Sequence, residues 1–98
     1  MPVIIVVDYP GGTQAQYEKV TNILTGGRGL VRAPSDWPVP GLISHASGPS
    51  PTGWFVTDTW ESKEAFQRFG EKLMPALQEA GMPDAEPKIY EAFNVVTS

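Results

Sequence analysis

The stretch Gly53–Ser62, which reads GWFVTDTWES, constrains the fold more than any other part of this chain. β-branched and aromatic residues dominate it, as they do in strands packed on a pleated surface. Alternation divides its side chains between two faces, one with Trp54, Val56, Asp58 and Trp60 and the other with Phe55, Thr57 and Thr59. Neither face is polar throughout, so we expect a central strand that is covered on both sides. Asp58 is then a carboxylate held among aromatic groups, which requires either hydrogen-bond partners or a function.

The spacing of apolar residues, together with helix-capping residues, glycines and prolines, predicts the remaining helices and strands. We expect strands at residues 2–8, 41–47 and 88–96, a helix from a Thr13–Gln16 capping box to Gly26–Gly27, and a helix from Ser62 to Gly81. Pro75 should either kink the second helix or begin a separate final segment. The order β-α-β-β-α-β predicts an α+β, ferredoxin-like fold with a four-stranded antiparallel sheet, in a single domain that spans residues 1–98.

The segment between residues 28 and 40 shows no period and contains three prolines. Long ordered connections of this kind often serve as lids or binding loops. Trp37 lies in the middle of the segment, where it could act as a lid residue or plug the edge of the core. The sequence leaves both alternatives open.

Composition excludes several functions. The formal net charge is -4 without a cluster of Lys and Arg, so neither nucleic acid nor an anionic membrane surface is an expected partner. The chain has no cysteine and one histidine, so a histidine- or thiolate-rich metal site cannot form within one subunit. The start of the chain lacks the pattern of a signal peptide, and a cytoplasmic protein is the simplest interpretation.

The sheet has one predicted feature that bears on assembly. Two helices can cover only one face of a four-stranded sheet, yet the predicted strands carry apolar residues on both faces. An uncovered apolar sheet face of that size is usually an interface. We therefore expect a homodimer in which the two sheets pack face to face.

The pattern resembles the antibiotic-biosynthesis-monooxygenase-like family of dimeric α/β barrels. The resemblance rests on Gly41-Leu-Ile-Ser-His45, Gly53-Trp54 and Asp58-Thr-Trp-Glu-Ser62 before a Phe-rich helix, and it covers nearly the whole chain. The family contains cofactor-free oxygenases, haem degraders, cyclases and isomerases, so the resemblance is more specific for fold than for function. Haem-degrading members carry an asparagine near the end of the first strand and a histidine on the second helix, whereas this sequence has Val7-Asp8 and no such histidine.

His45 and Asp58 are the candidate catalytic residues. If the hairpin turn centres on Ser50 and Pro51, His45 lies opposite Val56 and diagonal to Asp58 on the same face. Asp58 could then orient the imidazole of His45, which would act as a base. A shift of one residue would separate the two side chains. A structural histidine, and a structural Asp58 paired with an arginine or a loop amide, remain the alternatives.

The resemblance implies a pocket within each subunit, between the helices and the sheet. We expect apolar walls, a polar group and a lid around it, and the corresponding substrate-binding residues are Trp60, Trp54, Phe66, Tyr17 and Trp37. The favoured function is a small homodimeric monooxygenase that needs no cofactor and acts on an apolar aromatic or polyketide-like molecule. The alternatives are a cyclase or isomerase of the same fold and a non-catalytic dimer that binds a small ligand.

Overall fold

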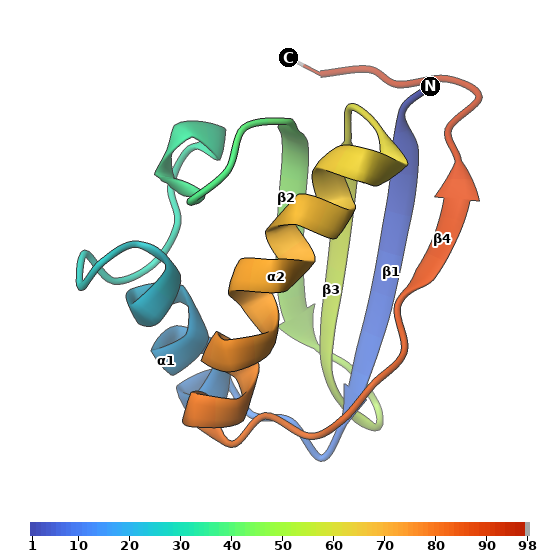
Figure 1. Ribbon diagram of the computed structural model, residues 1–98. Helices are drawn as coiled ribbons and strands as arrows, with labels where there is room; N and C mark the ends of the chain where they lie inside the picture. The colour runs from blue at the N-terminus through green and yellow to red at the C-terminus, as the bar shows by residue number, and fades with distance from the viewer. Residues whose placement is uncertain (98) are drawn as a thin grey trace.

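A computed structural model describes residues 1–97 of the chain. The elements follow the predicted order: β1 (Val3–Pro10), α1 (Gln14–Leu24), a short 3-10 helix η1 (Pro34–Asp36), β2 (Leu42–Pro49), β3 (Gly53–Trp60), α2 (Lys63–Ala80) and β4 (Lys88–Glu91). The four strands form one antiparallel sheet in the order β2-β3-β1-β4, and both helices cover the same face of it (Figure 1). The α+β ferredoxin-like fold is confirmed.

The central position of β3 is confirmed as well. β3 pairs with β1 on one side and with β2 on the other, and β1 in turn pairs with the edge strand β4. The inward side chains of β1 and β3 include Ile5, Trp54 and Trp60, and all three are buried. The core therefore lies between this face of the sheet and the two helices.

Local capping explains where the helices begin and end. Thr13 and Gln16 form the predicted capping box, in which each residue accepts a hydrogen bond from the other's backbone N–H. Ser62 accepts a bond from the Ala65 N–H at the start of α2, and Gly81 ends that helix in the left-handed region with φ of 72°. α2 continues through the exposed Pro75, so the separate final segment does not occur.

The β2–β3 hairpin differs in register from the prediction. Reciprocal backbone bonds join Ser50 and Gly53, so the turn centres on Pro51 and Thr52. This moves His45 from the predicted position opposite Val56 to a position directly opposite Asp58. The shift is by two residues on β3, which preserves the face on which both side chains lie. Gly53 is required here because an added Cβ would lie 2.2 Å from the Tyr9 carbonyl oxygen.

The last strand is shorter than predicted. β4 ends at Glu91, which pairs with Val3, the first residue of β1. Ala92 adds a single backbone bond of 3.0 Å to the Pro2 carbonyl, but Pro2 has no N–H to donate in return. The ladder therefore stops before the predicted end at Val96, and Phe93 and Val96 are exposed.

The other face of the sheet is not covered by any helix among the described residues (Figure 1). Its side chains include half-buried Ile4, Val6 and Phe55, and Tyr90, which is 54% exposed. No helix between residues 1 and 97 is both long and apolar enough to cross a membrane.

Candidate functional site

The single histidine is bonded directly to the buried carboxylate. The register places His45 on β2 beside Asp58 on β3, and His45 Nδ1 lies 2.5 Å from Asp58 Oδ1. The two side chains are only 13% and 6% exposed, so little water screens the contact. A carboxylate in this position accepts a hydrogen bond from Nδ1–H, which leaves Nε2 of the neutral ring unprotonated.

Tyr17 occupies the other side of the ring. Its hydroxyl lies 2.5 Å from His45 Nε2, and the two rings are stacked with centroids 6.0 Å apart. With Nδ1–H directed to Asp58, Nε2 is the acceptor and the phenol of Tyr17 is the donor. Burial raises the pKa of Tyr17, the Ser47 hydroxyl opposes this shift, and the charge of Asp58 adds to it. Tyr17 therefore keeps its proton at neutral pH and presents it to His45.

Trp60 completes this hydrogen-bond chain. Its indole Nε1–H donates to Asp58 Oδ2 at 3.1 Å, and the side chain is fully buried. Phe69 stacks on Trp60 at 4.9 Å between ring centroids, and Phe66 meets it edge-on at 6.2 Å. Asp58 thus has a donor on each carboxylate oxygen, which offsets the cost of burying its charge.

Tyr17, His45 and Asp58 line a cavity between the sheet and the two helices. The cavity has a volume of about 170 Å³. The polar residues that line it are Tyr9, Tyr17, Thr21, His45 and Asp58, and Trp37 lines it as well. Its apolar lining is much larger and comprises Ile5, Val7, Val20, Leu24, Val56, Phe66, Phe69, Leu73, Met74, Leu77, Met82, Ala85 and Pro87. A cavity of this kind suits a mostly apolar molecule with a few polar groups.

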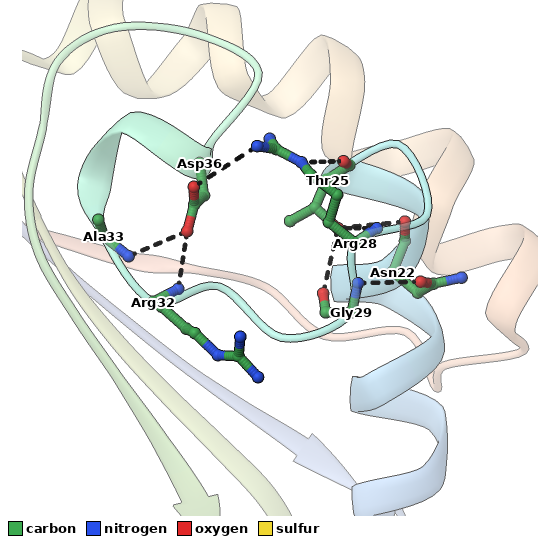
Figure 2. Close-up of polar contacts among 7 residues, drawn as sticks. All are labelled: Asn22, Thr25, Arg28, Gly29, Arg32, Ala33 and Asp36. Atoms are coloured by element: carbon green, nitrogen blue, oxygen red, sulfur yellow. Dashed lines mark hydrogen bonds and ion pairs between the residues drawn. The ribbon is translucent and has the colours of Figure 1, made fainter.

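Trp37 lies in the loop between α1 and β2 and lines this cavity. Asp36 accepts hydrogen bonds from the backbone N–H groups of Arg32 and Ala33 at 3.0 and 3.1 Å, and the Arg28 guanidinium lies 3.9 Å away (Figure 2). These bonds, led by that from Arg32, lower the pKa of Asp36. In the structure Trp37 is buried and also forms part of the cavity wall.

Hydrogen bonds join the first residues of the loop to the end of α1. The Thr25 hydroxyl donates to the Gly29 carbonyl at 3.1 Å and accepts from the Arg28 N–H at 3.2 Å. The Asn22 side chain accepts from the Gly29 N–H at 3.0 Å (Figure 2). Further along, Trp37 packs edge-on against His45, with centroids 5.1 Å apart, and stacks on Phe69 at 5.2 Å.

Tyr9 was not among the expected site residues, since it lies just before the turn Pro10-Gly11-Gly12. In the structure it is 5% exposed and lines the cavity. Burial, with a further contribution from the charge of Asp58, raises the pKa of Tyr9 to about 12. Tyr9 continues the inward alternation of Val3, Ile5 and Val7, and that period could have identified it.

The structure brings most of the predicted residues together. His45, Asp58, Tyr17, Phe66 and Trp37 all line the cavity. Two tryptophans do not, although both were expected as walls. Trp60 lies behind Asp58 as its hydrogen-bond donor, and Trp54 packs against Tyr17 with centroids 5.3 Å apart. Their contribution to the site is to support the polar side chains rather than to form its surface.

Metal ligands are sparse around the site. Within residues 1–97, no group of three or more His, Cys, Asp or Glu side chains is placed to hold a metal ion. The His45–Asp58 pair offers one nitrogen and two oxygens, but each of these atoms already has a partner in the hydrogen-bond chain.

Comparison with known proteins identifies the fold. No protein-family profile matches the sequence, and no curated protein is significantly similar to it. Among solved structures, the chain resembles a mutant of SnoaB, a cofactor-independent oxygenase from Streptomyces nogalater, with a TM-score of 0.60 and 15% identity over 99% of this chain and 97% of that one.

Two further structures have the same architecture. The monooxygenase ActVA-Orf6 from Streptomyces coelicolor, in complex with nanaomycin D, matches with a TM-score of 0.58 and 21% identity over 99% of this chain and 91% of that one. A protein from Deinococcus radiodurans described as an antibiotic biosynthesis monooxygenase matches with a TM-score of 0.57 and 13% identity over 100% and 98%. At these identities the likeness shows an antibiotic-biosynthesis-monooxygenase-type fold.

Proposed function

We propose that this protein is a small enzyme that oxygenates an apolar aromatic or polyketide-like molecule with dioxygen and without a bound cofactor. The main support for the proposal is the series of hydrogen bonds that links Tyr17, His45, Asp58 and Trp60. The first three of these residues line a mostly apolar cavity. The similarity in fold to a cofactor-independent oxygenase supports the same interpretation.

Tyr17 and His45 act together as the general base. A weakly acidic C–H or O–H group of the substrate transfers its proton to the Tyr17 oxygen while the Tyr17 proton passes to His45 Nε2, 2.5 Å away. The resulting imidazolium is stabilised by the Asp58 carboxylate at Nδ1. His45 therefore acts through Tyr17, and Asp58 is the positioning residue that selects the tautomer and balances the charge.

Oxygenation can then proceed with electrons from the substrate alone. The deprotonated carbon of an activated methylene group gives electrons to dioxygen and forms a carbon-bound hydroperoxide. Loss of water from this hydroperoxide leaves one oxygen atom as a new carbonyl, and the other departs in water with the two hydrogens of the methylene group. The four electrons that reduce dioxygen all come from the substrate carbon, so no external reductant is needed. The apolar walls exclude water from the carbanion.

The test is oxygen consumption with a dihydroxyanthracene whose keto tautomer carries a methylene group. With isotopically labelled dioxygen, we expect one labelled atom in the product by mass spectrometry, at a rate above that without protein. Tyr17→Phe and His45→Gln should each lower the rate by about 10²–10⁴-fold, the usual contribution of a general base. Glu71→Gln, at an exposed residue of α2 outside the cavity, is the control. Unchanged turnover in His45→Gln would overturn the proposal.

A second candidate function is a cyclase or isomerase of the same fold. The same base removes a proton from a substrate carbon, and a second carbon or the same proton then completes the reaction without dioxygen. Turnover of the same probe under anaerobic conditions would favour this function over oxygenation. Ligand binding without turnover under either condition would favour the non-catalytic alternative.

The proposal includes a homodimer formed through the uncovered sheet face. Half-buried Ile4, Val6 and Phe55 on that face support it, since an apolar surface of this kind is usually covered in solution. Analytical ultracentrifugation should give twice the chain mass of 10.6 kDa, and Phe55→Glu should shift the protein to the monomer. A monomer at all concentrations would contradict the dimer. The cytoplasmic location stays a prediction.

A further inference from the structure

Gly70 lies in the middle of α2, at a position where glycine disfavours the helix. An interior glycine destabilises a helix relative to alanine, because its backbone loses more conformational freedom on folding. Gly70 does not adopt a positive φ, so its backbone conformation suits any residue. A Cβ added to Gly70 would meet nothing within 4 Å, whereas one added to Gly41 would lie 2.8 Å from Ala65. Neither backbone conformation nor packing among the described residues therefore accounts for this glycine.

The open space beside Gly70 belongs to the cavity. Gly70 lines the cavity together with other residues of the same helix, namely Phe66, Phe69, Leu73, Met74 and Leu77. Successive residues of an α-helix are turned by about 100°, so all of these positions fall on one face. Gly70 lies within that face, between the direction of Leu77 and that of Met74. A side chain at this position would project into the cavity.

Gly70 is on the part of this helix face that lies away from the base. At one edge of the face, Phe69 stacks on Trp37, which packs against His45. At the other edge, Met74 lines the cavity and is 55% exposed, so the cavity reaches the surface there. Gly70 is next to Met74 on this face. The space that it leaves free therefore lies between the base and the opening of the cavity.

The size of the cavity indicates what would use this space. Its volume of about 170 Å³ is only slightly larger than the roughly 150 Å³ of an apolar cavity that binds one benzene ring in another protein. A single ring bonded through its hydroxyl to Tyr17 therefore fills most of the enclosed volume. A second fused ring has to extend toward the opening at Met74, along the bare backbone of Gly70.

We propose that Gly70 is a specificity-determining residue that leaves room for a second ring of the ligand between the base and the opening of the cavity. This assignment rests on the proposed function, since it takes the cavity as the substrate site. A side chain at this position would favour the helix but obstruct the larger ligand, which is a common conflict between stability and activity. Gly70 thereby selects fused-ring phenols over phenols with a single ring.

The test compares phenol with 2-naphthol, which adds one fused ring to the ring that carries the hydroxyl. Dissociation constants are measured by calorimetry at neutral pH, and thermal melts are recorded without ligand, for the unaltered protein and for Gly70→Ala. Gly48→Ala is the control, because it adds the same methyl group in open space on β2, outside the cavity. Gly70→Leu places a larger obstruction at the same position with a residue that also favours a helix.

The unaltered protein should bind 2-naphthol about tenfold or more tightly than phenol, because the second ring buries further apolar surface. Gly70→Ala should raise Tm by about 4–8 °C, since alanine is the better helix former. The same variant should weaken 2-naphthol binding by about tenfold and phenol binding by less than about twofold. Gly70→Leu should weaken 2-naphthol binding further, and Gly48→Ala should leave both constants within about twofold.

A lower Tm for Gly70→Ala would show that the fold itself requires this glycine and would overturn the assignment. Equal weakening of both probes, unchanged binding of 2-naphthol, or no binding of either probe would overturn it as well. These measurements need no turnover, so failure of oxygenation with the probe preference intact would count against the proposed function alone.

Discussion

Replacement of Asp58 by asparagine is the most direct test of the hydrogen-bond chain. Asp58 accepts from His45 Nδ1 at 2.5 Å and from Trp60 Nε1 at 3.1 Å, through different oxygens. Asparagine has nearly the same shape but only one acceptor oxygen, and its NH₂ group must face one of the two donors. While the ring proton stays on Nδ1, one buried donor therefore loses its partner whichever way the amide is oriented, and only a shift of that proton to Nε2 restores a partner for every group.

The cost to stability can be worked from this loss. In either tautomer both donors lose a charged acceptor, and a hydrogen bond to a charged group contributes about 1.5–3 kcal/mol against about 1 kcal/mol for a neutral one. The substitution also removes a buried charge, which offsets part of the cost. We expect a net loss of about 2 kcal/mol, which corresponds to a fall in Tm of roughly 10 °C for a domain of this size.

The cost to activity is larger because the tautomer changes. Without a carboxylate at Nδ1, the proton of the neutral ring can move to Nε2, where it meets the Tyr17 hydroxyl and removes the acceptor. We expect kcat/KM for the oxygenation to fall by about 10²–10⁴-fold below the melting transition. The phenolate absorbance of Tyr9 should appear at lower pH in the variant, because the charge of Asp58 contributes to its raised pKa.

Asp8→Asn provides the matched control. The Asp8 carboxylate also accepts two side-chain bonds, from Ser50 at 2.8 Å and from Thr52 at 2.5 Å, but it is exposed and does not line the cavity. Its substitution should leave kcat/KM within about twofold. If Asp58→Asn lowers Tm but leaves kcat/KM and its pH profile unchanged, Asp58 has only a structural role and the reasoning is refuted.

Three other substitutions test separate parts of the structure. Gly53→Ala should destabilise the protein by more than about 2 kcal/mol, because the new Cβ would clash with backbone, whereas Gly48→Ala, with nothing within 4 Å, should be tolerated; chemical denaturation distinguishes them. The raised pKa of Tyr9 favours the neutral phenol in the folded state, so the stability it contributes is lost as pH rises from about 10 to about 12. Tyr9→Phe should abolish this alkaline loss in thermal melts, and an unchanged profile would contradict it. Asp36→Asn should speed amide exchange at Arg32, whose N–H it accepts, and should remove the stability that is lost as pH falls through the lowered pKa of Asp36. Protection equal to that of the unaltered protein would show that the loop does not depend on this carboxylate.

Local signals were sufficient for most of the fold. The Thr13 capping box, the Ser62 cap and the glycine at position 81 mark helix ends through bonds within a few residues, so sequence spacing identifies them. The β-branched and aromatic residues on both faces of the stretch that became β3 identified it as a central strand, because this composition can be read from the strand itself. The length of β4 was not predictable in this way, since it depends on where its partner β1 begins.

The candidate site depended on contacts between distant parts of the chain. The sequence by itself determined which residue types were available: one histidine, a carboxylate on a buried face, and tryptophans near both. Only the tertiary structure decided that Tyr17 from α1 meets His45, that Trp60 supports Asp58 instead of lining the cavity, and that Tyr9 faces inward. Periodicity reports the face on which a side chain lies, whereas hydrogen bonds of 2.5 Å require the packing of a helix on a sheet in one register.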